Sequence, residues 1–239
     1  MKKFLQYVFS VIAGILLTFS SVNAGGESAS TSEGSASGTS SGLTFNVGYM
    51  TEYWFRGAFQ QNSSYSFGAD IESGNFYIGT WWARVGDKGG SSGGDGMEYD
   101  IYAGYNMEIF GIPSYVGVSG YYYTDDWDRD YEEVQVGMDF GLFAIDGAIF
   151  GSYKGDGSNA SSDYGHFTLS VPLGPVSYSY MTFTGGSLHS AAHELSYETS
   201  LAGFDVVGVV GANNDGGAGA TPNNNQDTEY FNITVGLSF

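Results

Sequence analysis

Apolar and polar residues alternate along most of the chain from residue 42 onward. In residues 97–109 every odd position is apolar or aromatic, whereas most even positions are acidic or small. A period of two places these two sets on opposite faces of a β-strand. The same alternation in residues 131–142 and 229–239 predicts two further strands, each with one apolar face.

Extended along the chain, this pattern predicts about twelve strands. They are expected at residues 43–55, 64–73, 75–86, 97–109, 114–123, 131–141, 143–154, 163–172, 175–184, 192–200, 203–212 and 228–239. Both faces of segment 75–86 are apolar or aromatic, so its facing stays open. Short turns alternate with mostly longer polar loops, which are expected at residues 56–63, 87–96, 124–130, 155–162, 185–191 and 213–227.

Two architectures explain an alternating all-β chain. A soluble β-sandwich or lipocalin-like barrel turns its apolar faces into a core. A barrel in the outer membrane turns them to lipid, and has short turns at one end and long loops at the other. Few Lys and Arg are available for a solvent-exposed face. We therefore predict a transmembrane, up-and-down antiparallel β-barrel of about 12 strands over residues 42–239.

Aromatic residues lie near the ends of the predicted strands, as expected for girdles at the two membrane interfaces. Beside the long loops these are Tyr53, Trp54, Phe55, Trp81, Trp82, Tyr121, Tyr122, Tyr123, Tyr131, Tyr153, Tyr164, Tyr230 and Phe231. Beside the short turns they are Phe45, Phe110, Phe140, Phe143, Phe204 and Phe239.

Composition narrows the function further. The 239 residues include 38 Gly, 19 Tyr and 17 Phe, a mixture that favours strands and turns over long helices. The formal charge of −19 excludes nucleic acid as the main partner, because such a surface repels phosphates. There is no Cys, so disulfides, thiol nucleophiles and thiolate metal sites are excluded.

The N-terminal region has the pattern of a secretory signal. Two lysines precede an uncharged apolar stretch, and small residues follow up to Ala24. We predict a signal peptide over residues 1–24, since the apolar stretch is short for a spanning helix. Residues 25–41 are nearly all Gly, Ser, Ala and Thr, and are predicted to be a disordered tail.

If the apolar faces meet lipid, the opposite faces line the lumen. The predicted lumen-lining residues are Asp70, Glu98, Asp100, Glu108, Glu133, Asp139, Asp146, Glu194, Glu198, Asp205, Arg56 and Lys154. Glu52 and Arg56 are both at even positions and are expected on the same strand face, so these two charges are expected to neutralise each other in part. Whether Arg84 faces inward stays open. The excess of carboxylates predicts a preference for cations or neutral solutes.

The sequence offers little support for a catalytic or metal-binding site. Among the three histidines, His166 shares a strand face with Ser170, but four residues along a strand span about 13 Å, too far for a nucleophile–base pair. The acidic loop 124–130 offers carboxylates to a divalent cation but lacks an EF-hand arrangement. We expect no catalytic residue, no cofactor and no resident metal.

The first strands also resemble the TorF family of porins. The similar motifs are Tyr53-Trp54-Phe55-Arg56-Gly57, the segment from Ser73 to Trp81, the acidic strand from Glu98 to Tyr105, and the Tyr-rich segment 120–123 followed by Glu133. This resemblance covers roughly residues 42–142 and implies an outer-membrane channel without a known substrate. The terminal Phe239 is similar to the assembly signal of outer-membrane proteins.

Together these patterns predict a porin for passive diffusion of small solutes in the outer membrane of a Gram-negative bacterium. Its partners would be outer-membrane lipid and lipopolysaccharide, and the barrel-assembly machinery through Phe239. Twelve strands lie between barrels filled by side chains and wide porins, which favours a narrow pore. The alternative is a non-conducting structural or adhesive barrel with a Tyr-filled interior, and a hydrolase is a more remote one.

Overall fold

A computed structural model describes residues 42–86, 95–125, 127–153, 162–185, 191–213 and 228–239. The predicted signal peptide, the predicted tail and Lys154 lie outside the described residues. Within this part of the chain, no helix is long and apolar enough to cross a membrane.

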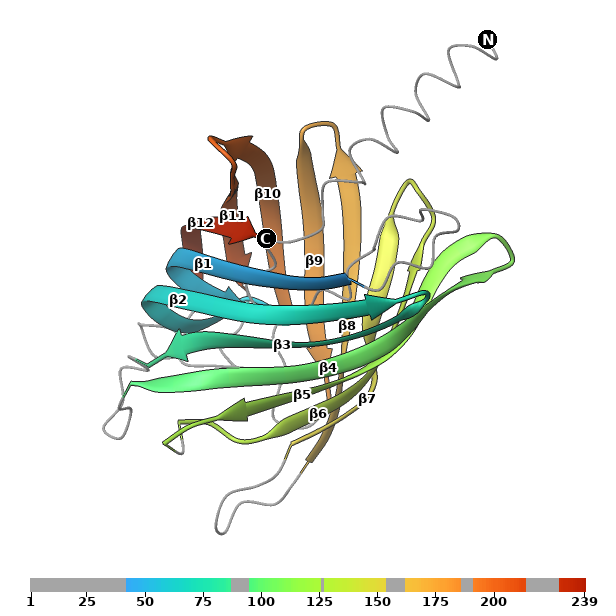
Figure 1. The fold of residues 1–239 in the computed structure, drawn as a ribbon, viewed down its shortest axis with the longest axis horizontal. Helices are drawn as coiled ribbons and strands as arrows, with labels where there is room; N and C mark the ends of the chain where they lie inside the picture. Colours follow the sequence, from blue (N-terminus) through green and yellow to red (C-terminus); the bar gives the residue numbers. More distant parts are fainter. Residues whose placement is uncertain (1–41, 87–94, 126, 154–161, 186–190, 214–227) are drawn as a thin grey trace.

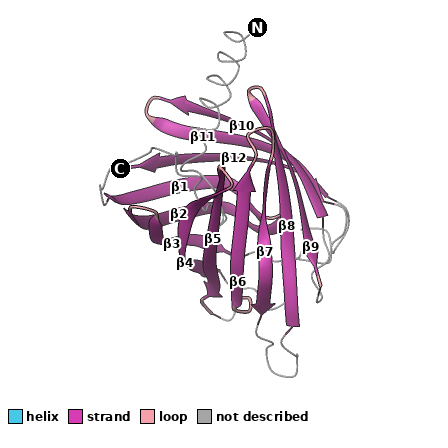
Figure 2. Cartoon of the chain, turned by 90° about the vertical axis from the view of Figure 1, so that its right-hand side faces the viewer, coloured by secondary structure: helices cyan, strands magenta, loops and turns pink. Residues whose placement is uncertain are grey.

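The described residues form a closed antiparallel barrel of twelve strands (Figures 1 and 2). Each strand pairs with its neighbours in sequence, and the first pairs with the last. The strands are β1 (Gly42–Phe55), β2 (Ala58–Ser73), β3 (Phe76–Val85), β4 (Gly96–Ile109), β5 (Ile112–Tyr123), β6 (Tyr131–Asp139), β7 (Ala144–Tyr153), β8 (Ser162–Leu173), β9 (Val176–Thr184), β10 (Ala191–Leu201), β11 (Phe204–Asn213) and β12 (Thr228–Ser238). The predicted fold class is confirmed.

Tight turns join β2 to β3, β4 to β5, β6 to β7, β8 to β9 and β10 to β11 at one end of the barrel, which we call the short-turn end. The seam between β1 and β12 closes at the same end. There the backbones of Phe45 and Phe239 exchange two hydrogen bonds of 2.9 and 3.0 Å, and their rings stack at 6.0 Å. The opposite end, where most of the longer connections lie, is called the long-loop end.

The outer face of the barrel is apolar and exposed. Ile101 and Val118, near the middle of their strands, are 54% and 53% exposed. On the inner face of the wall, polar side chains such as Gln135 on β6 and Thr168 on β8 are buried. A soluble protein rarely exposes so continuous an apolar surface. This arrangement is that of a barrel whose wall faces hydrocarbon.

The register of β3 shows which of its faces points into the barrel, a question that the sequence left open. Trp81 and Val85 are buried on the inner face, whereas Ile78 and Trp82 are on the outer face. Trp82 belongs to a row of outer rings in which Phe67, Trp82, Tyr99 and Tyr122 stack in succession at 5.0–5.8 Å. Arg84 also lies on the outer side, where its guanidinium is 2.7 Å from the carboxylate of Asp95.

The prediction of a loop over residues 56–63 is wrong. Strand β2 begins at Ala58, so only Arg56 and Gly57 form the turn after β1. Both turn residues have positive φ, at 49° and 77°, as a two-residue hairpin turn of type I′ requires. The polar run Gln60-Gln61-Asn62 looked like an external loop, but the two glutamines are buried inside the barrel.

Candidate functional site

The tip of the β1–β2 hairpin leaves the barrel wall. Pairing between β1 and β12 ends at Met50 and Thr234, and pairing between β2 and β3 begins only at Ser66 and Ala83. Between these points β1 and β2 continue to pair with each other. Residues 51–65, here called the inner hairpin, therefore leave the regular ladders with β12 and β3, although the Gly86 N–H still donates to the Gln60 carbonyl oxygen at 3.3 Å. Figure 1 shows the ends of β1 and β2 curling back across the barrel.

Burial shows that the inner hairpin enters the lumen. Ala58, Phe59, Gln60 and Gln61 are all buried in succession. A strand in a barrel wall buries only alternate residues on its inner side, so four consecutive buried residues mean that both faces of this hairpin are covered. The inner hairpin thus fills part of the lumen at the long-loop end.

Aromatic contacts anchor the hairpin to both sides of the lumen. Toward β12, the ring of Trp54 stacks on Tyr230 with centroids 4.0 Å apart and meets Phe59 edge-on at 5.2 Å. Toward β3, Tyr53 meets the ring of Trp81 edge-on at 5.6 Å. Ring pairs of this kind add about 0.5–1.5 kcal/mol beyond the area that they bury.

Arg56, at the tip, reaches the far wall. Its guanidinium donates two hydrogen bonds to the carboxylate of Glu133 on β6, at 2.7 and 3.0 Å. The two side chains are 1% and 0% exposed. The guanidinium also lies 4.7 Å from the ring of Phe55 and 5.7 Å from that of Phe183 on β9. The predicted neutralisation of Arg56 by Glu52 is wrong, because Arg56 pairs with a residue 77 positions away and Glu52 accepts from the Trp54 indole instead.

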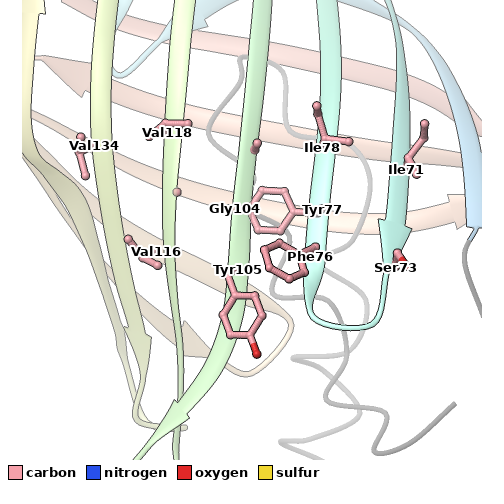
Figure 3. A pocket seen from close by; sticks show the side chains of 12 residues that line it. Ile71, Ser73, Phe76, Tyr77, Ile78, Gly104, Tyr105, Val116, Val118 and Val134 are labelled. Atoms are coloured by element: carbon pink, nitrogen blue, oxygen red, sulfur yellow. The ribbon is translucent and has the colours of Figure 1, made fainter. Parts of the chain in front are cut away.

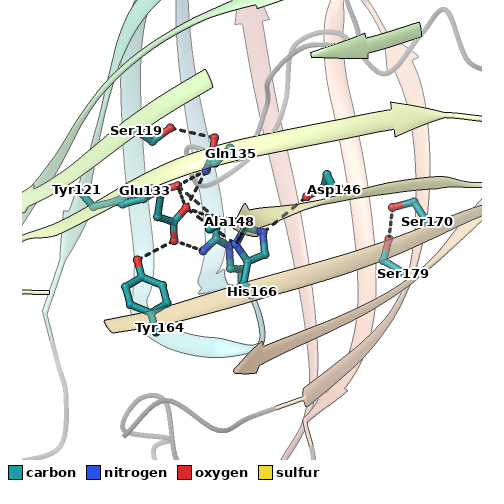
Figure 4. Close-up of polar contacts among 11 residues, drawn as sticks. Ser119, Tyr121, Glu133, Gln135, Asp146, Ala148, Tyr164, His166, Ser170 and Ser179 are labelled. Carbon is teal, nitrogen blue, oxygen red and sulfur yellow. Dashed lines mark hydrogen bonds and ion pairs between the residues drawn. The ribbon is translucent and has the colours of Figure 1, made fainter. Parts of the chain in front are cut away.

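Glu133 is the centre of a buried hydrogen-bond network (Figure 4). Besides Arg56, the Tyr164 hydroxyl donates to it at 2.7 Å, the Gln135 amide at 2.8 Å and the Tyr121 hydroxyl at 3.2 Å. A buried carboxylate is tolerated when charge and hydrogen bonds compensate for lost water. This network therefore fixes Glu133 as the anchor that receives the tip of the hairpin.

His166, on β8, borders the network without forming a catalytic pair. The Ala148 backbone N–H donates to its Nδ1 at 3.1 Å, so that nitrogen carries no proton. Its Nε2 lies 3.6 Å from the carboxylate of Asp146. Ser170, on the same strand face, pairs with the Ser179 hydroxyl at 3.4 Å (Figure 4). Among the described residues, no cluster of His, Asp and Glu has the geometry to hold a metal ion.

A second contact holds the tip against β10 and β11. The Asn213 side-chain amide donates a 2.8 Å hydrogen bond to the carbonyl oxygen of Gly57. A Cβ at Gly57 would collide with the side chain of Ala192, so only glycine fits this close approach. The hairpin thus contacts strands all around the barrel.

The remaining predicted lumen carboxylates differ in burial along the barrel. Glu98 and Asp100 on β4 are fully buried beside the inner hairpin, where the Tyr53 hydroxyl donates to Glu98 at 3.0 Å. Nearer the short-turn end, other inner-face carboxylates are half-buried or exposed; these are Asp70, Glu108, Asp139, Asp146, Glu198 and Asp205. Glu194 is half-buried toward the long-loop end of β10, where it accepts a hydrogen bond from the Tyr230 hydroxyl. The inner hairpin therefore occupies part of the inner space at the long-loop end, whereas the carboxylates nearer the short-turn end are less buried.

Many aromatics expected in the long-loop girdle point inward instead. The inward rings are Tyr53, Trp54, Trp81, Tyr121, Tyr153, Tyr164 and Tyr230. They pack against the inner hairpin or beside it, whereas the outer row from Phe67 to Tyr122 provides the aromatic surface of the wall. One signal of this packing was present in the sequence, namely a β3 segment that is apolar on both faces.

The outer wall carries a shallow apolar groove of about 510 Å³ over β2 to β6 (Figure 3). Its rim includes Ile78, Tyr105, Val116 and Val118, which lie on the outer face. The side-chain-free Gly104 and Gly117 form part of its floor. Such a surface suits hydrocarbon chains and offers little to a polar ligand.

The fold resembles solved bacterial channels. The KdgM porin, alone and in complex with disordered oligogalacturonate, matches with a TM-score of 0.52 and 9% identity, covering 82% of this chain and 99% of the porin. The COG4313 outer membrane channel from Pseudomonas putida F1 matches with a TM-score of 0.47 and 9% identity, covering 85% of this chain and 97% of that channel. At such low identity, the KdgM similarity shows a shared fold. No curated protein has a sequence significantly similar to this one.

A family profile gives the relationship in sequence. The profile described as "Bacterial protein of unknown function (Gcw_chp)" matches residues 33–187, which is more than half of the chain. The matched region includes the inner hairpin and its anchor, Glu133. The chain belongs to the Gcw_chp family.

Proposed function

We propose that this protein is an outer-membrane channel for the passive diffusion of small solutes. The observation that carries the proposal is the closed twelve-strand barrel with an apolar exposed wall and a polar interior. The shared fold of the KdgM porin supports it. The TorF resemblance of the first strands points to the same function, and the predicted signal peptide is consistent with export.

The interior chemistry favours cations or neutral solutes over anions. The carboxylates of Glu194, Glu198 and Asp205 face the lumen with partial exposure. Arg56, the cation on the inner hairpin, is already paired with Glu133. A confined surface of one sign attracts counter-ions and repels co-ions, most strongly at low salt, where the Debye length is long.

The same proposal indicates which molecules would contact the protein in the membrane. Outer-membrane lipid and lipopolysaccharide would contact the apolar wall. The barrel-assembly machinery would engage the C-terminal strand through Phe239, whose side chain is exposed beside the seam. Transport rather than catalysis is proposed, since Tyr121, Gln135 and Tyr164 all donate to Glu133 and this network is bonded within itself.

A second candidate function is a non-conducting structural or adhesive barrel. The inner hairpin favours this alternative, because it fills the lumen at the long-loop end with buried side chains. The two candidates differ in whether ions cross the barrel.

The zero-current potential across a salt gradient in planar bilayers tests the proposal. The wild-type protein should give a cation-selective potential, stronger at low salt. The triple variant Glu194→Gln, Glu198→Gln, Asp205→Asn should lose most of it. The matched control is Glu132→Gln, which neutralises a carboxylate on the outer face of β6. An anion-selective pore, or equal effects of the triple variant and the control, would contradict the assignment of the lumen.

A further inference from the structure

The inner hairpin lies beside strand edges of β12 and β3 with which it does not form a regular ladder. We propose that it is a gate, which closes the lumen when it lies inside the barrel and opens the lumen when it joins the wall. This inference rests on the proposed channel function. It is carried by the vacant wall position, by the contacts that hold the tip and by the charges that the hairpin covers.

The vacant position is a gap between β12 and β3 at the long-loop end. The register of β1 with β12 pairs Met50 with Thr234, and its continuation would place Trp54 opposite Tyr230. These two rings are already stacked, and the Ile233 backbone N–H already donates to the Thr51 hydroxyl at 2.9 Å. Closing the seam residue by residue would therefore lengthen an existing ladder without a change of register.

The other side of the hairpin has a matching position on β3. Continuation of the β2–β3 register beyond Ser66 and Ala83 would bring Ser64 opposite Val85. The Ser64 hydroxyl already donates to the carbonyl oxygen of Arg84 at 2.7 Å. On β3 only Arg84 and Val85 extend beyond the ladder, and the Gly86 N–H already donates to the Gln60 carbonyl oxygen at 3.3 Å. The longer edge available to the hairpin is therefore that of β12, and a strand edge favours the addition of a strand. Such edges are tolerated outside the hydrocarbon layer, where water satisfies them.

The closed position is held by a latch at the tip. The latch consists of the two hydrogen bonds from Arg56 to Glu133 and the hydrogen bond from Asn213 to Gly57. Opening exchanges these few strong contacts for backbone hydrogen bonds along β12 and at the end of β3. Two packed arrangements with different partners are what a two-state element requires.

The gate also covers charge. In the closed position, Tyr53 on the hairpin packs against Trp81 and bonds to Glu98, and Asp100 is buried nearby. Removing the hairpin from the lumen uncovers these two carboxylates. The open pore is therefore more acidic at the long-loop end than the closed one, so that opening and cation preference increase together.

A disulfide that locks the hairpin in its closed position tests the gate. Since the sequence has no native cysteine, no other thiol can react. A Cβ at Gly57 would lie 3.6 Å from that of Asn213, within the range of about 3.5–4.5 Å for a disulfide. Because it would also collide with Ala192, the lock is the triple variant Gly57→Cys, Ala192→Gly, Asn213→Cys. The control, Ala192→Gly with Asn213→Cys, has a single thiol.

Single-channel recording in planar bilayers should show that oxidation silences the lock variant and that dithiothreitol restores its current. The control should be indifferent to both reagents. Arg56→Ala should lengthen the open periods several-fold, because it removes the latch. The folded state of each variant is verified by its mobility on gels before and after boiling.

The outcomes separate the gate from the channel. If the lock variant conducts equally when oxidised and reduced, the gate is wrong although the channel stands. If mass spectrometry finds no disulfide after oxidation, the tip does not lie beside β11, and the gate is wrong as well. If the reduced lock variant, Arg56→Ala and the wild type all fold but carry no current, the channel function itself is wrong.

Discussion

A charge placed on the outer wall should separate a membrane barrel from a soluble one. Val118 is suited to this because it is 53% exposed and lies between Ala103 on β4 and Val134 on β6, near the middle of all three strands. The perturbation is Val118→Arg. The matched control is Ser179→Arg on the inner face of β9, opposite Glu194.

The two architectures predict different magnitudes. In a bilayer, arginine at the midplane of a barrel's lipid face costs about 2–4 kcal/mol of folding free energy. At a water-exposed position of a soluble barrel, the same substitution would stay within about 0.5 kcal/mol. The inner control should cost less than the outer variant, because the new guanidinium meets an acidic, half-exposed surface rather than hydrocarbon.

Urea titration of the protein refolded in phospholipid vesicles measures this difference, with the folded fraction read from gel mobility without boiling. Val118→Met controls for the change in size and should stay near wild type. We expect the order Val118→Arg, then Ser179→Arg, then Val118→Met, from most to least destabilising. If Val118→Arg is no more destabilising than Ser179→Arg, the outer face does not contact lipid.

Two further predictions concern the latch and the seam. Arg56→Met and Glu133→Gln should each lower the free energy of unfolding by up to about 3–5 kcal/mol in the same titration, because removing one partner leaves the other charge buried and unpaired. The double variant should lower it by less than the sum of the two, and additive losses would show that the pair is not coupled. Deleting Phe239 removes the two seam hydrogen bonds with Phe45 and should reduce assembled barrel in outer-membrane fractions more than Ser238→Ala does; equal amounts of both variants would argue against a terminal signal.

The strand pattern was predictable because the wall separates two environments. Eleven of the predicted strands agree with the structure to within about two residues at each end, since alternation is strong where one face of a strand is apolar and exposed and the other points into the barrel. Strand β2 was the exception at its start. The inner hairpin is buried on both faces, so the residues from Ala58 to Gln61 carry no alternation and the glutamines resembled a loop.

The latch could not be predicted from the alternation of apolar and polar residues. Alternation identifies which side chains face inward, but not which of them meet across a barrel. Arg56 and Glu133 are 77 residues apart and become neighbours only because the hairpin bends across the lumen. The same bend explains why the inner face of β3 is apolar, since Trp81 packs against Tyr53 rather than facing water.

Parity also fails where a strand has a bulge. In β7 the register shifts so that Ile149 and Phe150 are both exposed on the outer face, while Ala148 and Gly151 are both buried. The inward facing predicted for Lys154 assumes unbroken alternation along residues 143–154. Lys154 lies outside the described residues, so its facing stays a prediction.

Ionic current through the purified wild-type protein in planar bilayers tests the channel most directly. The sample is first shown to be folded by its gel mobility before boiling. We predict discrete current steps, separated by silent periods while the inner hairpin is closed, with longer open periods in Arg56→Ala. Bilayers that stay silent with both folded proteins would contradict the channel and leave a closed structural barrel as the account of this fold.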